Sequence, residues 1–319
     1  MGKYFNKMVA NKIKTAWLFP GQASQVVGMG KDLYQNTDIG KKYYNLANEI
    51  LNFDIKSISF HGPDLELKKT KYTQPSIFIV STIIGKILLE NGHKTDGVAG
   101  HSLGEYSALT VANAFNFEIG LKLVKIRSES MHKAGKAQPG KMAAIIGIPS
   151  NDIEDICLKY SKGKDLAVAA NYNTQNQIVI SGNGKIIDEI VKDAKSLGAK
   201  LAIPLKVSGA FHSPLMSNAR QALADELNSI DVLDINTPLY TNVDAKPITK
   251  SADIKNSLLR QLENPVQWLK SINNMVKDNF TSFSEIGPGK VLQNLNRKIV
   301  PSIPINGFQS FNDIQNHEI

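Results

Sequence analysis

Strand-like and helix-like segments alternate along most of this 319-residue chain, and that alternation constrains the fold more than any other feature. The apolar run 15–19 stops at Pro20-Gly21, as a buried strand would, and a second strand-like run, 96–99, leads into Gly100. Helix-like sequence follows each run. This pattern is typical of domains in which helices cover a largely parallel sheet, so we predict an α/β fold.

The segment 138–205 follows a different order. Its runs predict a β-α-β-β-α-β succession, the ferredoxin-like order, with strands at 142–147, 166–171, 177–181 and 200–205 and helices at 151–160 and 185–197. Mixed α/β sequence flanks it on both sides. We therefore predict a large α/β domain formed by residues 1–137 and 206–319, with a small ferredoxin-like domain, residues 138–205, inserted into it.

Composition narrows the class of protein. Hydrophobic residues make up 42% of the chain and charged residues 21%, as in ordinary globular proteins. The single cysteine, Cys157, excludes an internal disulfide and a multi-cysteine zinc site. Cys157 lies on the apolar side of a helix-like run, which predicts core packing.

The apolar and charged segments indicate where the protein acts. The longest apolar stretch, 77–89, is too short to span a bilayer and reads as a buried helix. The basic N-terminus, 1–14, lacks the apolar core of a signal peptide. We expect a cytoplasmic protein without membrane contact. The net charge of +8 is spread over scattered lysines, which argues against nucleic acid and suits phosphates or acidic partners.

The segment Gly100-His101-Ser102-Leu103-Gly104 matches the pattern G-x-S-x-G. It lies between the strand-like run 96–99 and a helix-like run, 105–114. A serine on such a strand-to-helix turn is exposed at the edge of the sheet, and the amide after it faces a developing oxyanion. We predict that Ser102 is a nucleophile. The alternative is a glycine turn in which Ser102 caps the helix.

A nucleophilic serine needs a base, and His212 is the best candidate by elimination. It lies in a loop after a strand-like run, next to Ser213-Pro214. The alternative is a loop histidine that caps Ser213 or the next helix. The other five histidines lie in turns, on a charged helix, beside the nucleophile or in the tail: His61, His93, His101, His132 and His317. No acid follows in a recognisable motif, so a backbone carbonyl is a candidate to orient the imidazole.

Arg127 is one of four arginines among 37 lysines and arginines, the others being Arg220, Arg260 and Arg297. Where lysine supplies most of the positive charge, an arginine indicates a planar, two-pronged contact such as one with a carboxylate. Arg127 follows a run of apolar helix positions and is expected at the edge of a buried face. The alternative is an ordinary surface arginine.

Together with four further segments, these residues resemble the malonyl-CoA:acyl-carrier-protein transacylases and the acyltransferase domains of polyketide synthases. The resemblance runs from about Lys14 to about Ile299. Its motifs occur in the family's order: Phe19-Pro20-Gly21-Gln22-Ala23-Ser24-Gln25, Thr73-Gln74-Pro75, Gly100-His101-Ser102-Leu103-Gly104-Glu105-Tyr106, Gly209-Ala210-Phe211-His212-Ser213, Asn264-Pro265-Val266-Gln267-Trp268 and Glu285-Ile286-Gly287-Pro288-Gly289. Six ordered motifs in one chain are not expected by chance.

The resemblance implies a catalytic arrangement. Ser102 would carry the acyl group, with His212 as its base. The backbone N–H groups of Gln22 and Leu103 would form the oxyanion hole. The main chain around Gln267 would orient His212, giving a dyad rather than a triad. No metal or bound cofactor is implied.

The resemblance also implies the substrate and the fold. Arg127 would pair with the free carboxylate of malonyl, and Phe211 would crowd an α-methyl branch and exclude methylmalonyl. The core would be α/β-hydrolase-like. The family usually has glycine where this chain has Ala23, and a methyl group is tolerated there if φ is negative.

The expected partners are malonyl-CoA and the phosphopantetheine arm of acyl carrier protein, and we expect a monomer. Two other functions remain open at this point: a serine hydrolase or thioesterase, and a carrier-binding module without catalysis. Within the transferases, fatty acid synthesis is the commoner role, and the alternative is action in trans on a polyketide synthase.

Overall fold

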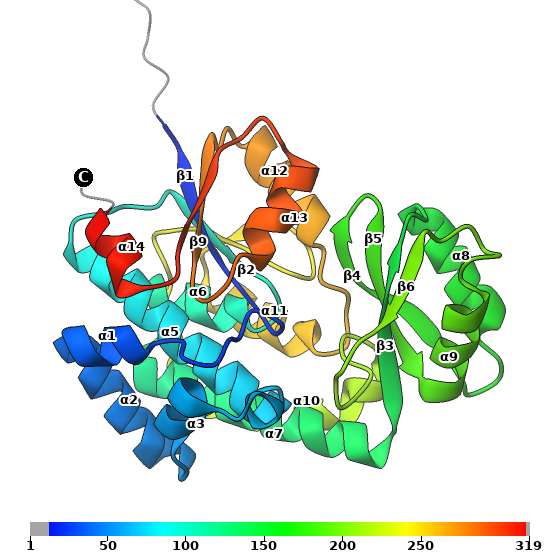
Figure 1. Cartoon of the computed structure of the whole chain (residues 1–319), viewed down its shortest axis with the longest axis horizontal. Coiled ribbons are helices and arrows are strands. Elements are labelled where there is room, and N and C mark those ends of the chain that lie inside the picture. The colour runs from blue at the N-terminus through cyan, green and yellow to red at the C-terminus, as the bar shows by residue number, and fades with distance from the viewer. Residues whose placement is uncertain (1–12, 317–319) are drawn as a thin grey trace, which may run out of the picture.

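The computed structural model describes residues 13–316, which form two sheets with helices packed against them (Figure 1). Most of the segment 1–14, from which we expect no signal peptide, lies outside the described residues, and so does His317. The larger sheet has the order β10-β9-β1-β2-β7-β8. Its strands are β1 (Thr15–Phe19), β2 (Gly97–Gly100), β7 (Leu239–Tyr240), β8 (Pro247–Ile248), β9 (Ser282–Ile286) and β10 (Ile305–Phe308).

The larger sheet is parallel except at one edge. Strands β10, β9, β1, β2 and β7 pair in parallel, and only β8 pairs antiparallel, with β7. Residues 16–19 of β1 and all of β2 are buried, as expected for strands covered on both faces. The predicted α/β class is confirmed, and both predicted strands lie within one residue of their observed positions.

Helices surround the larger sheet. Those before the small sheet are α1 (Lys31–Asn36), α2 (Asp38–Leu51), α3 (Ile55–His61), α4 (Asp64–Leu67), α5 (Thr70–Glu90), α6 (Gly104–Val111) and α7 (Phe117–Ala137). Those after it are the 3₁₀ turn η1 (Pro214–Met216), α10 (Ser217–Ser229), α11 (Ser251–Gln261), α12 (Trp268–Lys277), α13 (Val291–Ile299) and α14 (Phe311–Asn316).

Helix α5 is the central helix of the core. Among the described helices it alone is long and apolar enough to cross a membrane by length and composition, yet 83% of that stretch is buried inside the protein. A helix that is apolar on all sides and buried in this way belongs to a protein core. The predicted buried helix at 77–89 is confirmed.

The second sheet is formed by the middle of the chain. Its strands are β3 (Gly140–Ile146), β4 (Ala167–Thr174), β5 (Gln177–Asn183) and β6 (Leu201–Pro204), in the order β4-β5-β3-β6 with antiparallel neighbours throughout. Helices α8 (Ser150–Tyr160) and α9 (Gly184–Asp193) pack on one face. Cys157 is buried in that layer, where burial raises the pKa of its thiol to about 12, so the predicted core packing is confirmed.

The other face of the small sheet packs against the larger body. Met142 and Ala144 of β3 belong to the same apolar cluster as α5 and α7. Two backbone hydrogen bonds also join the bodies, from the N–H of Tyr172 to the carbonyl of Val266 and from the N–H of Val266 to the carbonyl of Ala170, both 2.9 Å. The loop that precedes α12 is thereby held by β4.

The turn between β2 and α6 requires its glycines. A Cβ atom on Gly104 would collide with the carbonyl oxygen of Phe19, and one on Gly100 would collide with the backbone of Gly104. Helix α6 can therefore begin directly under the end of β1. The predicted helix at 105–114 is present and ends three residues earlier than expected, at Val111.

The loop after β1 contains an unexpected backbone conformation. Ala23 has φ +86°, so the condition of a negative φ is not met. The loop is held by a 2.8 Å hydrogen bond from the N–H of Ala23 to Oε1 of Gln25. An L-residue in the left-handed region costs about 1–2 kcal/mol, whereas glycine adopts it freely.

Replacing Ala23 by glycine should therefore stabilise the protein. The gain of about 1–2 kcal/mol from relieved strain exceeds the roughly 0.5–1 kcal/mol of extra backbone entropy that glycine loses on folding. Urea denaturation would measure the difference. The matched control is Ala222→Gly on the exposed side of α10, which should lose about 1 kcal/mol because it lies in a helix interior. Equal losses in both variants would contradict strain at Ala23.

Candidate active site

Ser102 lies at the turn between β2 and α6 with φ +51°, a strained value for a residue other than glycine. Its backbone N–H donates to Oδ1 of Asn242 at 2.7 Å, which stabilises the turn. The alternative that Ser102 caps the helix is not observed, because α6 has no side-chain cap. The hydroxyl group instead contacts His212 and Arg127.

His212 lies 2.8 Å from Ser102, measured from Nε2 to Oγ. Its Nδ1 is 2.9 Å from the carbonyl oxygen of Gln261 and 3.2 Å from that of Asn264. Because both partners are acceptors, Nδ1 carries the proton and Nε2 is free to accept one. Burial, and then the positive charge of Arg127, lower the pKa of His212 to about 3, so the imidazole is neutral at physiological pH.

The residue that orients His212 is not the predicted one. The N–H of Gln267 donates to the carbonyl of Asn242 at 2.8 Å, and Gln267 is not among the residues that line the cavity around Ser102. The main chain does orient the imidazole, as expected, but from Gln261 and Asn264. Asn264 is the first residue of the predicted segment around Gln267, whereas Gln261 precedes that segment and Gln267 itself forms no hydrogen bond with the imidazole.

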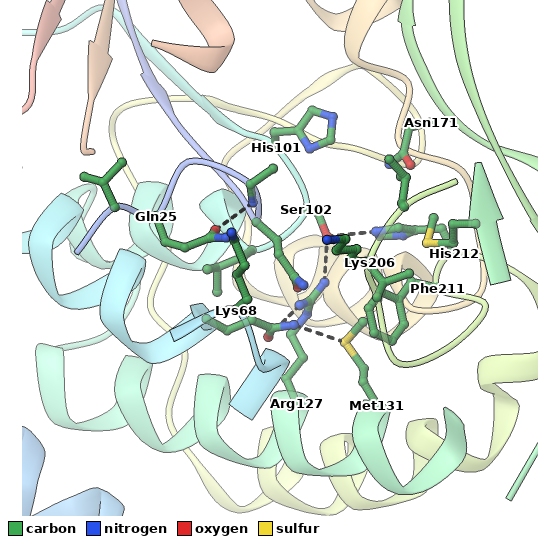
Figure 2. Close-up of a pocket in the computed structure, with 18 of the residues that line it drawn as sticks. Gln25, Lys68, His101, Ser102, Arg127, Met131, Asn171, Lys206, Phe211 and His212 are labelled. Atoms are coloured by element: carbon green, nitrogen blue, oxygen red, sulfur yellow. Dashed lines mark hydrogen bonds between the residues drawn. The ribbon is translucent and has the colours of Figure 1, made fainter. Parts of the chain in front are cut away.

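Arg127 projects from α7 toward Ser102 (Figure 2) and is only 1% exposed. Its Nη2 donates to Oγ of Ser102 at 2.9 Å and to Oε1 of Gln261 at 3.0 Å, and its Nη1 donates to Oε1 of Gln74 at 2.7 Å. The guanidinium also lies over the ring of Tyr106, 5.5 Å from its centroid. Arg127 is thus buried beside the serine and is not a surface residue.

The charge of Arg127 lacks a close counter-ion. Within residues 13–316 no carboxylate forms an ion pair with it, and its Nε has no hydrogen-bond partner. Burial therefore lowers the pKa of the guanidinium. A buried cation held only by neutral oxygens favours an anionic ligand, which would supply the missing charge and acceptors.

A polar platform under Ser102 was missed by sequence reasoning. The side-chain Nε2 of Gln261 donates to the carbonyl of Ser102 at 3.0 Å and to the carboxylate of Glu105. Glu105 also accepts from the N–H of Asn242 at 2.9 Å, and Nδ2 of Asn242 donates to the carbonyl of Gly100 at 2.6 Å. Burial raises the pKa of Glu105 to about 7. Of these three side chains, only Glu105 belongs to the serine motif, so it gave the one sequence signal for this group of hydrogen bonds.

Two further residues line the same cavity. Gln22 and Leu103 both line it, and in the described part of the chain neither backbone N–H has an acceptor. The side chain of Gln22 is fixed at the rim by a 3.5 Å contact from Nε2 to Oγ1 of Thr70. Free amides beside a serine hydroxyl are the donors that a tetrahedral oxyanion requires.

The cavity has a volume of about 590 Å³. Ser102, Arg127 and His212 converge on it, with Phe211 and Met131 beside them (Figure 2). The ring of His101 turns away from this group, and its Nε2 lies 2.8 Å from Oδ1 of Asn173. Across residues 13–316, no three metal-ligating side chains of the His, Cys, Asp or Glu type gather together.

Comparison with known proteins identifies the family. Residues 16–311 match the family model described as acyl transferase domain. A malonyl CoA-acyl carrier protein transacylase of Bacillus subtilis is 42% identical over 90% of both chains. The crystal structure of a malonyl-CoA:ACP transacylase from Synechocystis sp. PCC 6803 is 37% identical with a TM-score of 0.88, covering 95% of this chain and all of that one.

A second solved structure, at 33% identity and a TM-score of 0.91, is a type II polyketide synthase acyl-carrier protein in complex with its malonyl-transacylase; the match covers 95% of this chain and 98% of that one. These similarities extend over almost the whole chain rather than over the serine motif alone. The chain therefore belongs to the acyl transferase domain family and, within it, to the malonyl CoA-acyl carrier protein transacylases.

Proposed function

We propose that this chain transfers malonyl from malonyl-CoA to the phosphopantetheine thiol of acyl carrier protein in fatty acid synthesis, through an ester on Ser102. The observation that carries the proposal is the double contact of the Ser102 hydroxyl. One neighbour, at 2.8 Å, is a neutral imidazole, and the other, at 2.9 Å, is a buried guanidinium that forms no ion pair with the described residues. The first suits proton removal, and the second suits an acyl group that ends in a carboxylate.

The hydroxyl proton can move in one direction only. Arg127 donates to Oγ of Ser102, so the hydroxyl directs its own proton to Nε2 of His212. His212 accepts that proton as Oγ attacks the thioester carbonyl, and the positive charge that develops on the ring is stabilised by the carbonyls of Gln261 and Asn264. A Ser–His dyad oriented by the main chain is therefore sufficient.

The two half-reactions use the same groups. The tetrahedral oxyanion would accept hydrogen bonds from the N–H groups of Gln22 and Leu103. When the intermediate collapses, His212 returns its proton to the departing thiolate of coenzyme A, and the malonyl ester remains on Ser102. The carrier thiol then gives its proton to His212 and attacks the ester, which restores the Ser102 hydroxyl. This is a ping-pong sequence without a metal or bound cofactor.

Arg127 distinguishes this function from the alternatives. A hydrolase or thioesterase could use Ser102 and His212 but has no need of a buried cation at the nucleophile. A carrier-binding module would need neither. Action in trans on a polyketide synthase uses the same site, and the relatives named malonyl CoA-acyl carrier protein transacylase support the fatty acid role.

The architecture supports the expected domain division. The order β4-β5-β3-β6 with antiparallel neighbours is the one that a ferredoxin-like β-α-β-β-α-β segment produces, and its limits at Gly140 and Pro204 fall inside 138–205. A serine on a strained turn after a parallel strand supports the α/β-hydrolase-like description. A monomer in the cytoplasm stays our expectation.

Intact-mass spectrometry after mixing with malonyl-CoA should show one malonyl adduct on Ser102, which disappears when holo-carrier protein is added. Ser102→Ala should show no adduct. His212→Ala should slow adduct formation by about 10³-fold or more, since general base catalysis contributes 10²–10⁴-fold. If water removed the adduct as fast as the carrier does, the protein would be a thioesterase instead.

Arg127→Ala should lower malonyl transfer by about 100-fold or more, because two charge-assisted hydrogen bonds to the carboxylate are lost. Acetyl transfer should stay equal or rise, because acetyl has no carboxylate. The control is Arg127→Lys, which keeps the charge but not the fork and should recover malonyl transfer only in part. Equal losses for both acyl groups would rule out a role in selectivity.

Phe211 is proposed to exclude branched acyl groups. It is buried, lines the cavity and directly precedes the base. A bulky ring at this position would crowd an α-methyl group on an acyl chain attached to Ser102. In the adduct assay, methylmalonyl-CoA should react slowly with the native protein and faster with Phe211→Ala. Equal rates for malonyl-CoA and methylmalonyl-CoA in the native protein would disprove this role.

The rate of Ser102 malonylation should not decrease near pH 6.5, where an ordinary histidine becomes protonated. Because the pKa of His212 is lowered to about 3, the base stays neutral as the pH falls, and the rate should hold to about pH 5. A limb near pH 7 that disappears in Glu105→Gln would belong to Glu105, whose pKa is about 7. A limb near pH 6.5 that persists in Glu105→Gln would show that His212 titrates normally.

A further inference from the structure

Strand β6 exposes two large apolar side chains at the edge of the small sheet. Leu201 is 49% exposed and Ile203 is 42% exposed. Between them, Ala202 packs against the cluster that contains α8 and α9. Side chains alternate across a sheet, so Leu201 and Ile203 lie on the face opposite to Ala202. Ala144 of the neighbouring strand β3 pairs with Ile203 and lies on the same face, where it belongs to the core shared with the larger body. Their exposure is therefore on the side of the cavity and away from the helices.

This apolar strip leads into the cavity. Directly after β6, the chain segment 205–207 lines the cavity, and the N–H of Leu205 is bonded to the carbonyl of Met142 at 2.9 Å. Ser208 then lies 3.3 Å from Thr70, measured between their hydroxyl oxygens. A molecule seated on Leu201 and Ile203 would be next to the opening through which Ser102 is reached.

Three lysines lie beside the segments that meet at Ser208: Lys206 lines the cavity, Lys71 follows Thr70 and Lys136 follows Gly135. Lys71, Lys136 and Lys206 are exposed, and within residues 13–316 none forms an ion pair. By contrast, Lys68 and Lys69 are paired with Asp64 and Glu66.

The lysines are close to one another. The end of α7 packs against the segment that enters the cavity, since a Cβ on Gly135 would collide with the carbonyl of Ser208. Burial lowers the pKa of His132, and the charges of Lys136 and Lys71 lower it further. Both lysines therefore lie close enough to His132 to act on the same imidazole. The rim is therefore positively charged where the apolar strip ends.

We infer that these five residues, Leu201, Ile203, Lys71, Lys136 and Lys206, form the docking surface for the acidic body of the carrier protein. The inference rests on the proposed function. The carrier brings its thiol on an arm that must enter the cavity, so its folded body has to stop at the rim. Apolar side chains beside unpaired cations match a partner surface that presents apolar residues among carboxylates. Coenzyme A has no such body and does not require the apolar strip.

The test uses Ile203→Glu and Lys136→Glu in the full chain, because neither residue lines the cavity. The matched controls are Leu158→Glu and Lys159→Glu on α8, where Leu158 is 75% exposed and Lys159 is also exposed. Each control introduces the same charge change on helix α8, which covers the face of the small sheet away from the cavity. Three rates are measured for each variant: Ser102 malonylation by malonyl-CoA, transfer to holo-carrier protein, and transfer to free pantetheine.

Both test variants should raise KM for the carrier by about 10-fold or more, equivalent to about 1.4 kcal/mol. Malonylation of Ser102 and transfer to free pantetheine should stay within about 2-fold of native, and the controls should resemble the native protein in all three rates. Lys136→Glu should also flatten the decrease of carrier transfer with rising salt, because screening acts on exposed charges. An unchanged KM for the carrier, or the same rise in the controls, would overturn the docking surface. A native protein that fails to form the malonyl adduct would instead overturn the proposed function.

Discussion

The buried positive charge of Arg127 is the constraint on which the site depends. It lies 2.9 Å from the serine hydroxyl and is held only by side-chain oxygens of neutral residues. Such an arrangement favours an anionic ligand, because no carboxylate of the described residues forms an ion pair with the guanidinium and the charge of the nearby Glu105 offsets its desolvation only in part. Under the proposed function, this charge would bind the carboxylate of the acyl group, and the affinity gained there would be directed to the acyl group rather than to the rest of the substrate.

The same charge explains the state of the base. A guanidinium beside a buried imidazole disfavours a second positive charge, and together with burial it holds the pKa of His212 near 3. The imidazole is then unprotonated at physiological pH, but it is a weaker base than an exposed histidine. When malonyl binds, its carboxylate would offset the charge of Arg127 and make protonation of His212 easier at the moment of attack. Selectivity and base strength are coupled through one residue.

Gln261 forms hydrogen bonds to His212, Arg127 and Ser102 and so connects the three residues of the site. Its carbonyl orients His212, its side-chain oxygen accepts from Arg127, and its side-chain nitrogen donates to the carbonyl of Ser102. It lies at the end of α11, and the segment that follows is bonded to β4 of the small sheet through Val266. The serine turn, the arginine, the base and the small sheet are therefore held by one short stretch of chain.

Much of this molecule could be predicted from local patterns. Alternating apolar segments specify the α/β class and the order of the elements in the middle sheet, because period and length are local properties. The glycines around Ser102 specify a strand-to-helix turn, and among the four arginines Arg127 follows a run of apolar helix positions. The six ordered motifs identified the family, which the comparisons confirmed.

Only the tertiary structure decided the rest. The carbonyls that orient His212 belong to Gln261 and Asn264 rather than to Gln267, and no pattern along the chain distinguishes among carbonyl groups, which every residue carries. The positive φ of Ala23 accompanies a hydrogen bond from its N–H to Oε1 of Gln25, and its own methyl side chain does not specify it. Gln74 and Glu105 meet Arg127 and Gln261 across 53 and 156 positions of sequence. Contacts of that separation arise when the sheets and helices pack, so the sequence named the reacting groups and the fold determined their neighbours.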